Sequence, residues 1–95
     1  MGATLMMANE MNAYTLSDRA TWINYKNKTN LDIICQDEPP LKNQYGIIAV
    51  NPNISENINF KNAIKYINWL ISDEGGQLIN SFRKNNQQLF YFNYK

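Results

Sequence analysis

The clearest hydrophobic pattern lies in the last third of the chain. Apolar residues recur there at helical spacing, at Phe60, Ala63, Ile64, Ile67 and Ile71, while the positions between them are mostly Lys and Asn. This periodicity predicts an amphipathic helix over residues 60–71. Ser72 is a typical N-cap, and the acidic residues that follow it suit the positive end of a helix dipole. A second helix is therefore predicted over residues 72–82.

The first third of the chain predicts two further helices. Residues 3–11 are rich in helix formers. Apolar residues at Leu16, Ala20 and Ile23 keep the i, i+4, i+7 spacing of a second helix over residues 18–27. Thr15 and Asp18 have the spacing of a capping box before this helix, and Ser17 is an alternative cap.

Three short segments have the composition of strands. They are residues 31–35, 45–50 and 87–92, and the second has continuous β-branched content that is typical of a strand buried on both faces. Pro39 and Pro40 lie between the first two segments. Proline lacks an amide donor, so this stretch is predicted to be extended and to cross between elements.

Four helices and three short strands indicate an α/β fold, but the strands do not form a complete sheet. Three strands spread over sixty residues do not form an obvious sheet, and a small domain buries a low fraction of its surface. The aromatic end of the chain and residues 47–50 are expected to expose unpaired apolar strand edges, which can associate with another strand. We therefore expect the chain to require an adjoining lobe, a homo-oligomer or a domain swap.

Composition excludes several classes of function. Ninety-five residues form one domain at most, so one copy cannot build a two-lobed protein with a cleft. The net charge of +1 provides no basic field for nucleic acid. The chain has no His and one Cys, which excludes His-based acid–base catalysis, Cys/His zinc sites and an intramolecular disulfide. No cofactor and no enzymatic activity are predicted.

No targeting signal is recognisable in the sequence. No apolar run approaches the roughly 20 residues of a membrane span. The first residues have neither the basic flank nor the long apolar stretch of a signal peptide.

Three stretches of the chain together resemble one known family. They are Gly2–Arg19, with its Ala-Tyr-Thr-Leu-Ser-Asp run; Asn43–Pro52, with Tyr-Gly-Ile-Ile-Ala-Val; and Trp69–Gly75 together with Gln87–Phe90. In this order they resemble the C-terminal part of the tungstate-binding proteins of bacterial ABC uptake systems, which are type II periplasmic binding proteins. The resemblance spans nearly the whole chain and corresponds to roughly the last third of such a protein.

The family fold implies two α/β lobes joined by crossing strands, with an oxyanion bound in the cleft. By this resemblance, residues 1–28 correspond to the end of the second lobe, residues 29–50 to crossing strands, and residues 51–95 to a piece of the first lobe. The implied partners are tungstate or molybdate and an ABC transporter permease, at a periplasmic or cell-surface-anchored location. The family's Thr/Ser-rich oxyanion loop and its Arg-bearing motif have no counterpart here, so one copy is not expected to bind tungstate completely.

Gly2, Ala3 and Thr4 are the first candidate ligand residues. Tetrahedral oxyanions are commonly held by backbone N–H groups at a helix start and by hydroxyl groups. Gly2 permits close approach and Thr4 adds a hydroxyl, so this helix start is suited to half of a ligand shell. The alternative is an ordinary helix start with no ligand.

Tyr14 is the fourth candidate, because its segment resembles the one in which molybdate-binding relatives place a ligand-contacting tyrosine. The alternative is that its ring packs as a hydrophobic staple before the next helix. Arg19 is expected to be solvated or paired locally rather than to bind an anion. Cys35 is expected to behave as a small buried hydrophobe.

Two functions from different classes follow. The first is a solute-binding component of a tungstate-type importer, present as a C-terminal portion that does not bind the ligand alone. The second is a truncated assembly or interaction piece that pairs with itself or with the missing N-terminal lobe and binds no small molecule.

Overall fold

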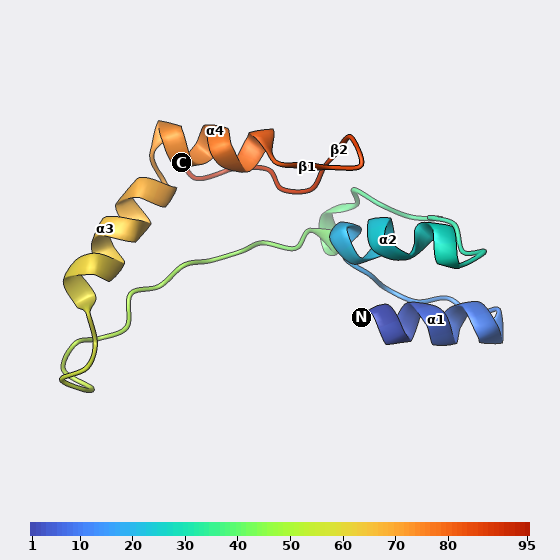
Figure 1. The fold of residues 1–95 in the computed structure, drawn as a ribbon, viewed down its shortest axis with the longest axis horizontal. Coiled ribbons are helices and arrows are strands. Elements are labelled where there is room, and N and C mark those ends of the chain that lie inside the picture. The colour runs from blue at the N-terminus through green and yellow to red at the C-terminus, as the bar shows by residue number, and fades with distance from the viewer. The chain divides into compact units, whose positions relative to one another are not determined.

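The computed structural model describes all residues from 1 to 95, and its regular elements are mainly helical (Figure 1). Four α-helices are present, as the sequence predicts. They are α1 (Gly2–Met11), α2 (Arg19–Tyr25), α3 (Phe60–Leu70) and α4 (Asp73–Ser81), accompanied by two short 3-10 turns, η1 (Lys26–Lys28) and η2 (Pro39–Leu41), and two strands, β1 (Arg83–Lys84) and β2 (Gln87–Gln88). The chain divides into two compact units, residues 1–44 with 84–89 and residues 45–83 with 90–95.

The buried core of the first unit lies between α1 and α2. Leu5 and Ala8 of α1 and Ile23 of α2 are at most 5% exposed, and they are the buried apolar residues with side chains in the molecule. Helix α1 ends at Asn12, which adopts the left-handed conformation with φ of 50°, and its N–H closes the last turn onto the Ala8 and Asn9 carbonyls. Asn tolerates this conformation better than most residues, which explains why the helix stops here.

Helix α2 begins at a side-chain cap that the sequence pattern misplaced. Asp18 is the N-cap, and its carboxylate accepts hydrogen bonds from the Thr21 N–H at 2.6 Å and the Thr21 hydroxyl at 3.1 Å. The predictions of Thr15 or Ser17 as the cap are therefore wrong. Leu16 lies before the helix and is 68% exposed, so it does not belong to the buried face with Ile23. A carboxylate can accept both bonds at once, and a single hydroxyl oxygen competes poorly with it.

The segment after η1 is tied to the first unit by polar contacts. The Asn30 N–H donates to the side chain of Asn9 on α1 at 2.7 Å. Pro39 and Pro40 form the 3-10 turn η2 instead of the predicted extended crossing, with the Leu41 N–H donating to the Glu38 carbonyl at 2.8 Å. Proline has a fixed φ that suits the first turn of a helix, so the pair starts a turn as readily as it extends.

The strand prediction is wrong in number and place. Residues 31–35 and 45–50 form no strand, and of residues 87–92 only Gln87 and Gln88 do. The one sheet is a hairpin of β1 and β2, and its two-residue turn has positive φ at Asn85 (51°) and Asn86 (61°). Two successive positive φ values are typical of a type I′ turn, which brings strands together locally. The other segments lack any neighbouring strand, and a single strand leaves its backbone unpaired.

The second unit is built on the corner between α3 and α4. Ser72 caps α4 as predicted, accepting a hydrogen bond from the Gly75 N–H at 3.3 Å. Gly75 and Gly76 are buried, because α4 passes close to the end of α3 and because the Phe92 ring lies on Gly76. The Phe92 N–H donates to the Asn80 side chain at 2.9 Å, which fastens the end of the chain to α4.

The apolar face of α3 is present but only partly covered. No residue of α3 is buried, and the Tyr66 and Trp69 rings stack on each other with centroids 6.1 Å apart. Cys35 is also exposed, which contradicts its expected burial, because the strand that was to bury it does not form. Exposure is general in this chain, because most large apolar side chains of both units lie at the surface.

We expect Gly75→Ala to lower the stability of the second unit. A β-carbon at Gly75 would meet the Trp69 and Leu70 carbonyl oxygens and lie 2.8 Å from the Leu70 carbonyl carbon. Backbone atoms cannot move aside cheaply, so we expect a loss of about 1–3 kcal/mol, read as a lower melting temperature by far-UV circular dichroism.

Gly46→Ala is the matched control, because a β-carbon at Gly46 meets nothing within 4 Å. This variant should stay within about 0.5 kcal/mol of the parent chain. Equal melting temperatures for the two variants would contradict the close packing assigned to Gly75.

Candidate functional site

The start of α1 presents backbone donors that no side chain caps. Met1 is the N-cap residue and makes no side-chain hydrogen bond to the helix. The first N–H groups of a helix have no acceptor within it, so they remain available to a ligand or to water. Ala3 and Thr4 are exposed, and Gly2 is half-buried. The candidates Gly2, Ala3 and Thr4 therefore form one contiguous helix start.

Gly2 is needed for packing against Tyr25. A β-carbon at Gly2 would lie 2.7 Å from the Tyr25 Cε2 atom, so the ring occupies the space that any other residue would fill. The Lys28 ammonium group lies over the same ring, 5.2 Å from its centroid. The fold thus places the Tyr25 phenol beside the helix start and the Lys28 ammonium group over the Tyr25 ring. Neither residue was identified from sequence, because the contact joins residues more than twenty positions apart.

Tyr14 lies at the other end of α1. It follows Asn12, the C-terminal cap, and the chain then returns along the helix until the Asp18 N–H reaches the Met1 sulfur at 3.4 Å (Figure 1). Ten helical residues span about 15 Å. Tyr14 therefore lies near the C-terminal end of α1, whereas Gly2, Ala3 and Thr4 lie at its N-terminal end. The structure does not gather the four candidates at one point. Its side chain is 88% exposed, which contradicts the alternative of a packed hydrophobic staple.

Arg19 is paired within its own unit, although with Asp37, 18 positions along the chain, and not with the local partner that the sequence analysis expected. Its guanidinium group lies 3.1 Å from the Asp37 carboxylate, and both side chains are accessible to water, with exposed fractions of 32% and 74%. An exposed pair of this kind contributes little to stability. The contact nevertheless neutralises the charge of Arg19, which makes it a poorer anion ligand.

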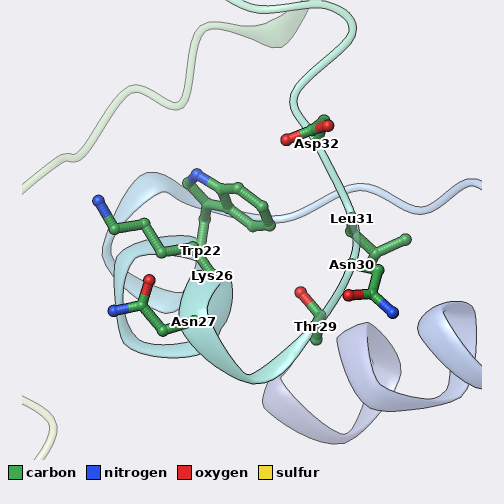
Figure 2. A pocket seen from close by; sticks show the side chains of 7 residues that line it. All are labelled: Trp22, Lys26, Asn27, Thr29, Asn30, Leu31 and Asp32. Carbon is green, nitrogen blue, oxygen red and sulfur yellow. The ribbon is translucent and has the colours of Figure 1, made fainter.

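A hollow of about 420 Å³ lies on the first unit, between α2 with η1 and the segment that follows them (Figure 2). It is lined by Trp22, Lys26, Asn27, Thr29, Asn30, Leu31 and Asp32. Trp22 and Lys26 come from one helical face at i and i+4 spacing, and Asp32 faces them from the opposite side (Figure 2). Its lining combines a cation with a carboxylate, so it lacks the uniform donor character of an oxyanion site. None of the four candidate residues lines it.

The second unit has a smaller hollow of about 350 Å³ along α4. It is lined by Trp69, Glu74, Gln77, Leu78 and Ser81. Glu74 brings a negative charge, which disfavours an anion at this place. The candidate residues also lie outside this hollow.

Two further features bear on function, namely clusters of metal ligands and membrane-spanning helices. The side chains form no group of three or more His, Cys, Asp or Glu residues that would hold a metal ion. None of the helices has the length and apolar character to cross a membrane.

Comparison with known proteins gives one family match and several relatives. The profile of the PBP superfamily domain matches residues 1–74. The tungstate-binding protein TupA of Peptoclostridium acidaminophilum is 44% identical over 84 residues, covering 88% of this chain and 29% of that protein. The TupA of Campylobacter jejuni is 37% identical over 99 residues, covering all of this chain and 37% of that protein.

A candidate ABC transporter anion-binding protein of Haloferax volcanii is 39% identical over 100 residues, which cover 98% of this chain and 29% of that protein. No solved structure matches the chain significantly. The chain thus spans about a third of the length of these relatives.

We expect Asp18→Ala to destabilise α2 and to loosen the return of the chain toward Met1. The substitution removes the acceptor for both the Thr21 N–H and the Thr21 hydroxyl. Loss of such a cap costs about 1 kcal/mol, which a thermal melt followed by far-UV circular dichroism should register. Asp18→Asn keeps an acceptor oxygen at the same position and should retain most of the stability. An unchanged melt for Asp18→Ala would contradict the assignment of Asp18 as the cap.

Proposed function

Because this chain belongs to the PBP superfamily, we propose that it supplies part of the binding site of a solute-binding protein for tungstate or a related tetrahedral oxyanion, serving an ABC importer. The observation that carries the proposal is the 44% identity to a tungstate-binding TupA over 88% of this chain. Such a component binds and releases its solute without a catalytic step. The proposal includes a periplasmic or cell-surface location and a permease partner.

The start of α1 is the proposed contact with the anion. Aligned peptide dipoles give a helix N-terminus positive potential, and its free N–H groups donate to an anion. Ala3 and Thr4 are exposed there without a competing side-chain cap, and Thr4 adds a hydroxyl donor. A fully ionised oxyanion only accepts hydrogen bonds, so a shell of neutral donors suits it better than a mixed shell. Selectivity would then follow from cavity size and donor count.

Of the two tyrosines considered, only Tyr25 lies close enough to extend this contact. Tyr25 lies against Gly2, so its phenol is next to the helix start. Tyr14 is exposed beyond the other end of α1, about 15 Å of helix away, so its phenol would meet an anion only at a separate place from the helix start. We therefore assign the contact to Gly2, Ala3 and Thr4 and do not include Tyr14 in it.

The remaining donors would come from outside this chain. The chain spans 29% of the length of the Peptoclostridium acidaminophilum TupA. Its helix start is open to solvent on the side of Ala3 and Thr4, and neither hollow encloses it. Water competes strongly with hydrogen bonds at an open site, so enclosure by other residues is required for tight binding. We expect weak or undetectable binding by this chain alone.

The second candidate function is an assembly piece that binds no small molecule. The observation that favours it is the surface of both units, where large apolar side chains such as Ile34 (77% exposed) and Ile48 (88% exposed) are open to water. Apolar surface of this extent is typical of a protein contact. An assembly function would use these exposed apolar surfaces whether or not an anion is bound.

Titration calorimetry with tungstate, molybdate, phosphate and sulfate tests the proposal. We expect a flat trace for the chain alone at millimolar anion. We expect saturable tungstate binding when the chain is combined with the part of the Peptoclostridium acidaminophilum TupA that it does not match. Absence of tungstate binding by a stable complex of the two would contradict the solute-binding function and favour the assembly function.

Variants of the chain locate the contact within that complex. Thr4→Val should weaken tungstate binding about tenfold or more, since a hydrogen bond to a charged group contributes about 1.5–3 kcal/mol. Thr15→Val is the matched control, because Thr15 is exposed and lies outside α1. Tyr25→Phe then tests the phenol beside Gly2, and Tyr14→Phe should leave the affinity unchanged. Equal affinities for Thr4→Val and Thr15→Val would contradict the role of the helix start.

A further inference from the structure

The hollow between α2 with η1 and the segment that follows them places two opposite charges beside one aromatic ring. Lys26 and Asp32 both line it, and the Trp22 ring lies between their side chains (Figure 2). Neither charged side chain forms a salt bridge, since the ion pair of this unit joins Arg19 to Asp37. The hollow therefore holds an ammonium group and a carboxylate that are both available to a ligand.

Both walls of the hollow are held in place by contacts outside it. On one side, α2 is anchored by Ile23, whose side chain is only 3% exposed. On the other side, the Asn30 N–H donates to the Asn9 side chain at 2.7 Å. The Thr29 hydroxyl donates to the Tyr25 carbonyl at 3.4 Å, which joins the two walls at their base. A ligand would therefore meet walls that are already positioned and would lose little affinity to ordering them.

The space between the two charges has an apolar lining. The Trp22 ring comes from α2 and Leu31 from the opposite segment, and both side chains are half-buried (Figure 2). The volume of about 420 Å³ lies within the range of small-molecule sites. Methylene groups placed here would be removed from water, which favours their binding.

The charges select the class of ligand. An anion would be repelled by Asp32, and a cation would be repelled by Lys26. An uncharged ligand would displace water from both groups without replacing it by a charge of opposite sign, which is unfavourable. A zwitterion avoids all three costs, because it brings one charge of each sign.

We propose that this hollow binds a small ω-amino acid, a zwitterion whose ammonium and carboxylate groups are separated by a short aliphatic chain. Its carboxylate pairs with Lys26, its ammonium group pairs with Asp32, and its methylene groups pack on the Trp22 ring. An α-amino acid carries its two charges too close together to reach both sides of that ring. The hollow is separate from the helix start of α1, so the proposal does not depend on oxyanion binding.

Tryptophan fluorescence of the full chain tests the proposal directly. The chain has two tryptophans, so Trp69→Phe leaves Trp22 as the reporter of the hollow. In an oxyanion-free buffer, ε-aminocaproate should change the Trp22 emission saturably. The dissociation constant should be millimolar, because ion pairs open to water contribute little. Hexylamine, hexanoate and sorbitol lack one charge or both, and glycine lacks the spacing, so each should bind about threefold or more weakly.

Charge variants, made in the Trp69→Phe chain, then identify the contacts. Lys26→Met should reduce the affinity for ε-aminocaproate about threefold or more and remove its advantage over hexylamine. Asp32→Asn should in the same way remove its advantage over hexanoate. Lys28→Met and Glu38→Gln are the matched controls, because neither residue lines the hollow, and both should retain the affinity. None of these four side chains is buried, so every variant should keep the parental far-UV circular dichroism.

Three outcomes would overturn the proposal. One is the absence of a saturable change in Trp22 emission at tens of millimolar ε-aminocaproate. Another is equal affinity for ε-aminocaproate and any of hexylamine, hexanoate, sorbitol or glycine, which would show that the hollow does not recognise two spaced charges. The last is an equal loss of affinity in the hollow variants and their matched controls, which would exclude Lys26 and Asp32 as the contacts.

Discussion

The pairing of backbone hydrogen bonds determines what this chain can build. A helix satisfies its N–H and C=O groups within one segment, whereas a strand needs a neighbour. All four helices predicted from hydrophobic periodicity, helix-forming composition or capping residues are present. The one strand pair is the hairpin whose partners are joined by the Asn85–Asn86 turn. Segments that would need a distant partner, such as residues 46–50, remain without regular structure.

The same dependence on neighbouring segments explains which apolar side chains are buried and which are exposed. In the first unit, α1 and α2 pack directly and bury Leu5, Ala8 and Ile23. In the second unit, α3 keeps an apolar face with no fully buried residue, and Ala63, Ile67 and Leu70 on it are half-buried. Burial of apolar area is the main favourable term in folding, so the interactions that stabilise the first unit internally differ from those that stabilise the second. The corner at Gly75, the Phe92 contact and the contacts of the Phe90 ring with Tyr45 and Phe82 hold the second unit in place of a broad core.

The candidate site depends on the packing of α1 in a comparable way. Its start is open because Met1 offers no side-chain cap, and it is bordered by Tyr25 because Gly2 leaves room for that ring. The donors that this helix start offers are mainly backbone N–H groups, whose position is fixed by the helix rather than by side-chain identity.

Local order was determined by the sequence itself. The helical spacing of Phe60, Ile64 and Ile67, the cap at Ser72 and the helix start at Gly2 all follow from interactions within a few residues, which is why they were predictable. The cap at Asp18 was missed because three hydroxyl or carboxylate side chains within four positions compete for one role. The type I′ hairpin was missed because Asn is a weaker signal than Asn-Gly for this turn.

Only the tertiary structure decided the contacts between distant residues. It placed Tyr25 on Gly2, paired Arg19 with Asp37, and set Tyr14 beyond the end of α1 away from the other candidates. It also left residues 31–35 and 45–50 unpaired, although their composition is typical of strands. The physical reason is that composition sets what a segment prefers, whereas pairing and burial depend on which other segments come within reach.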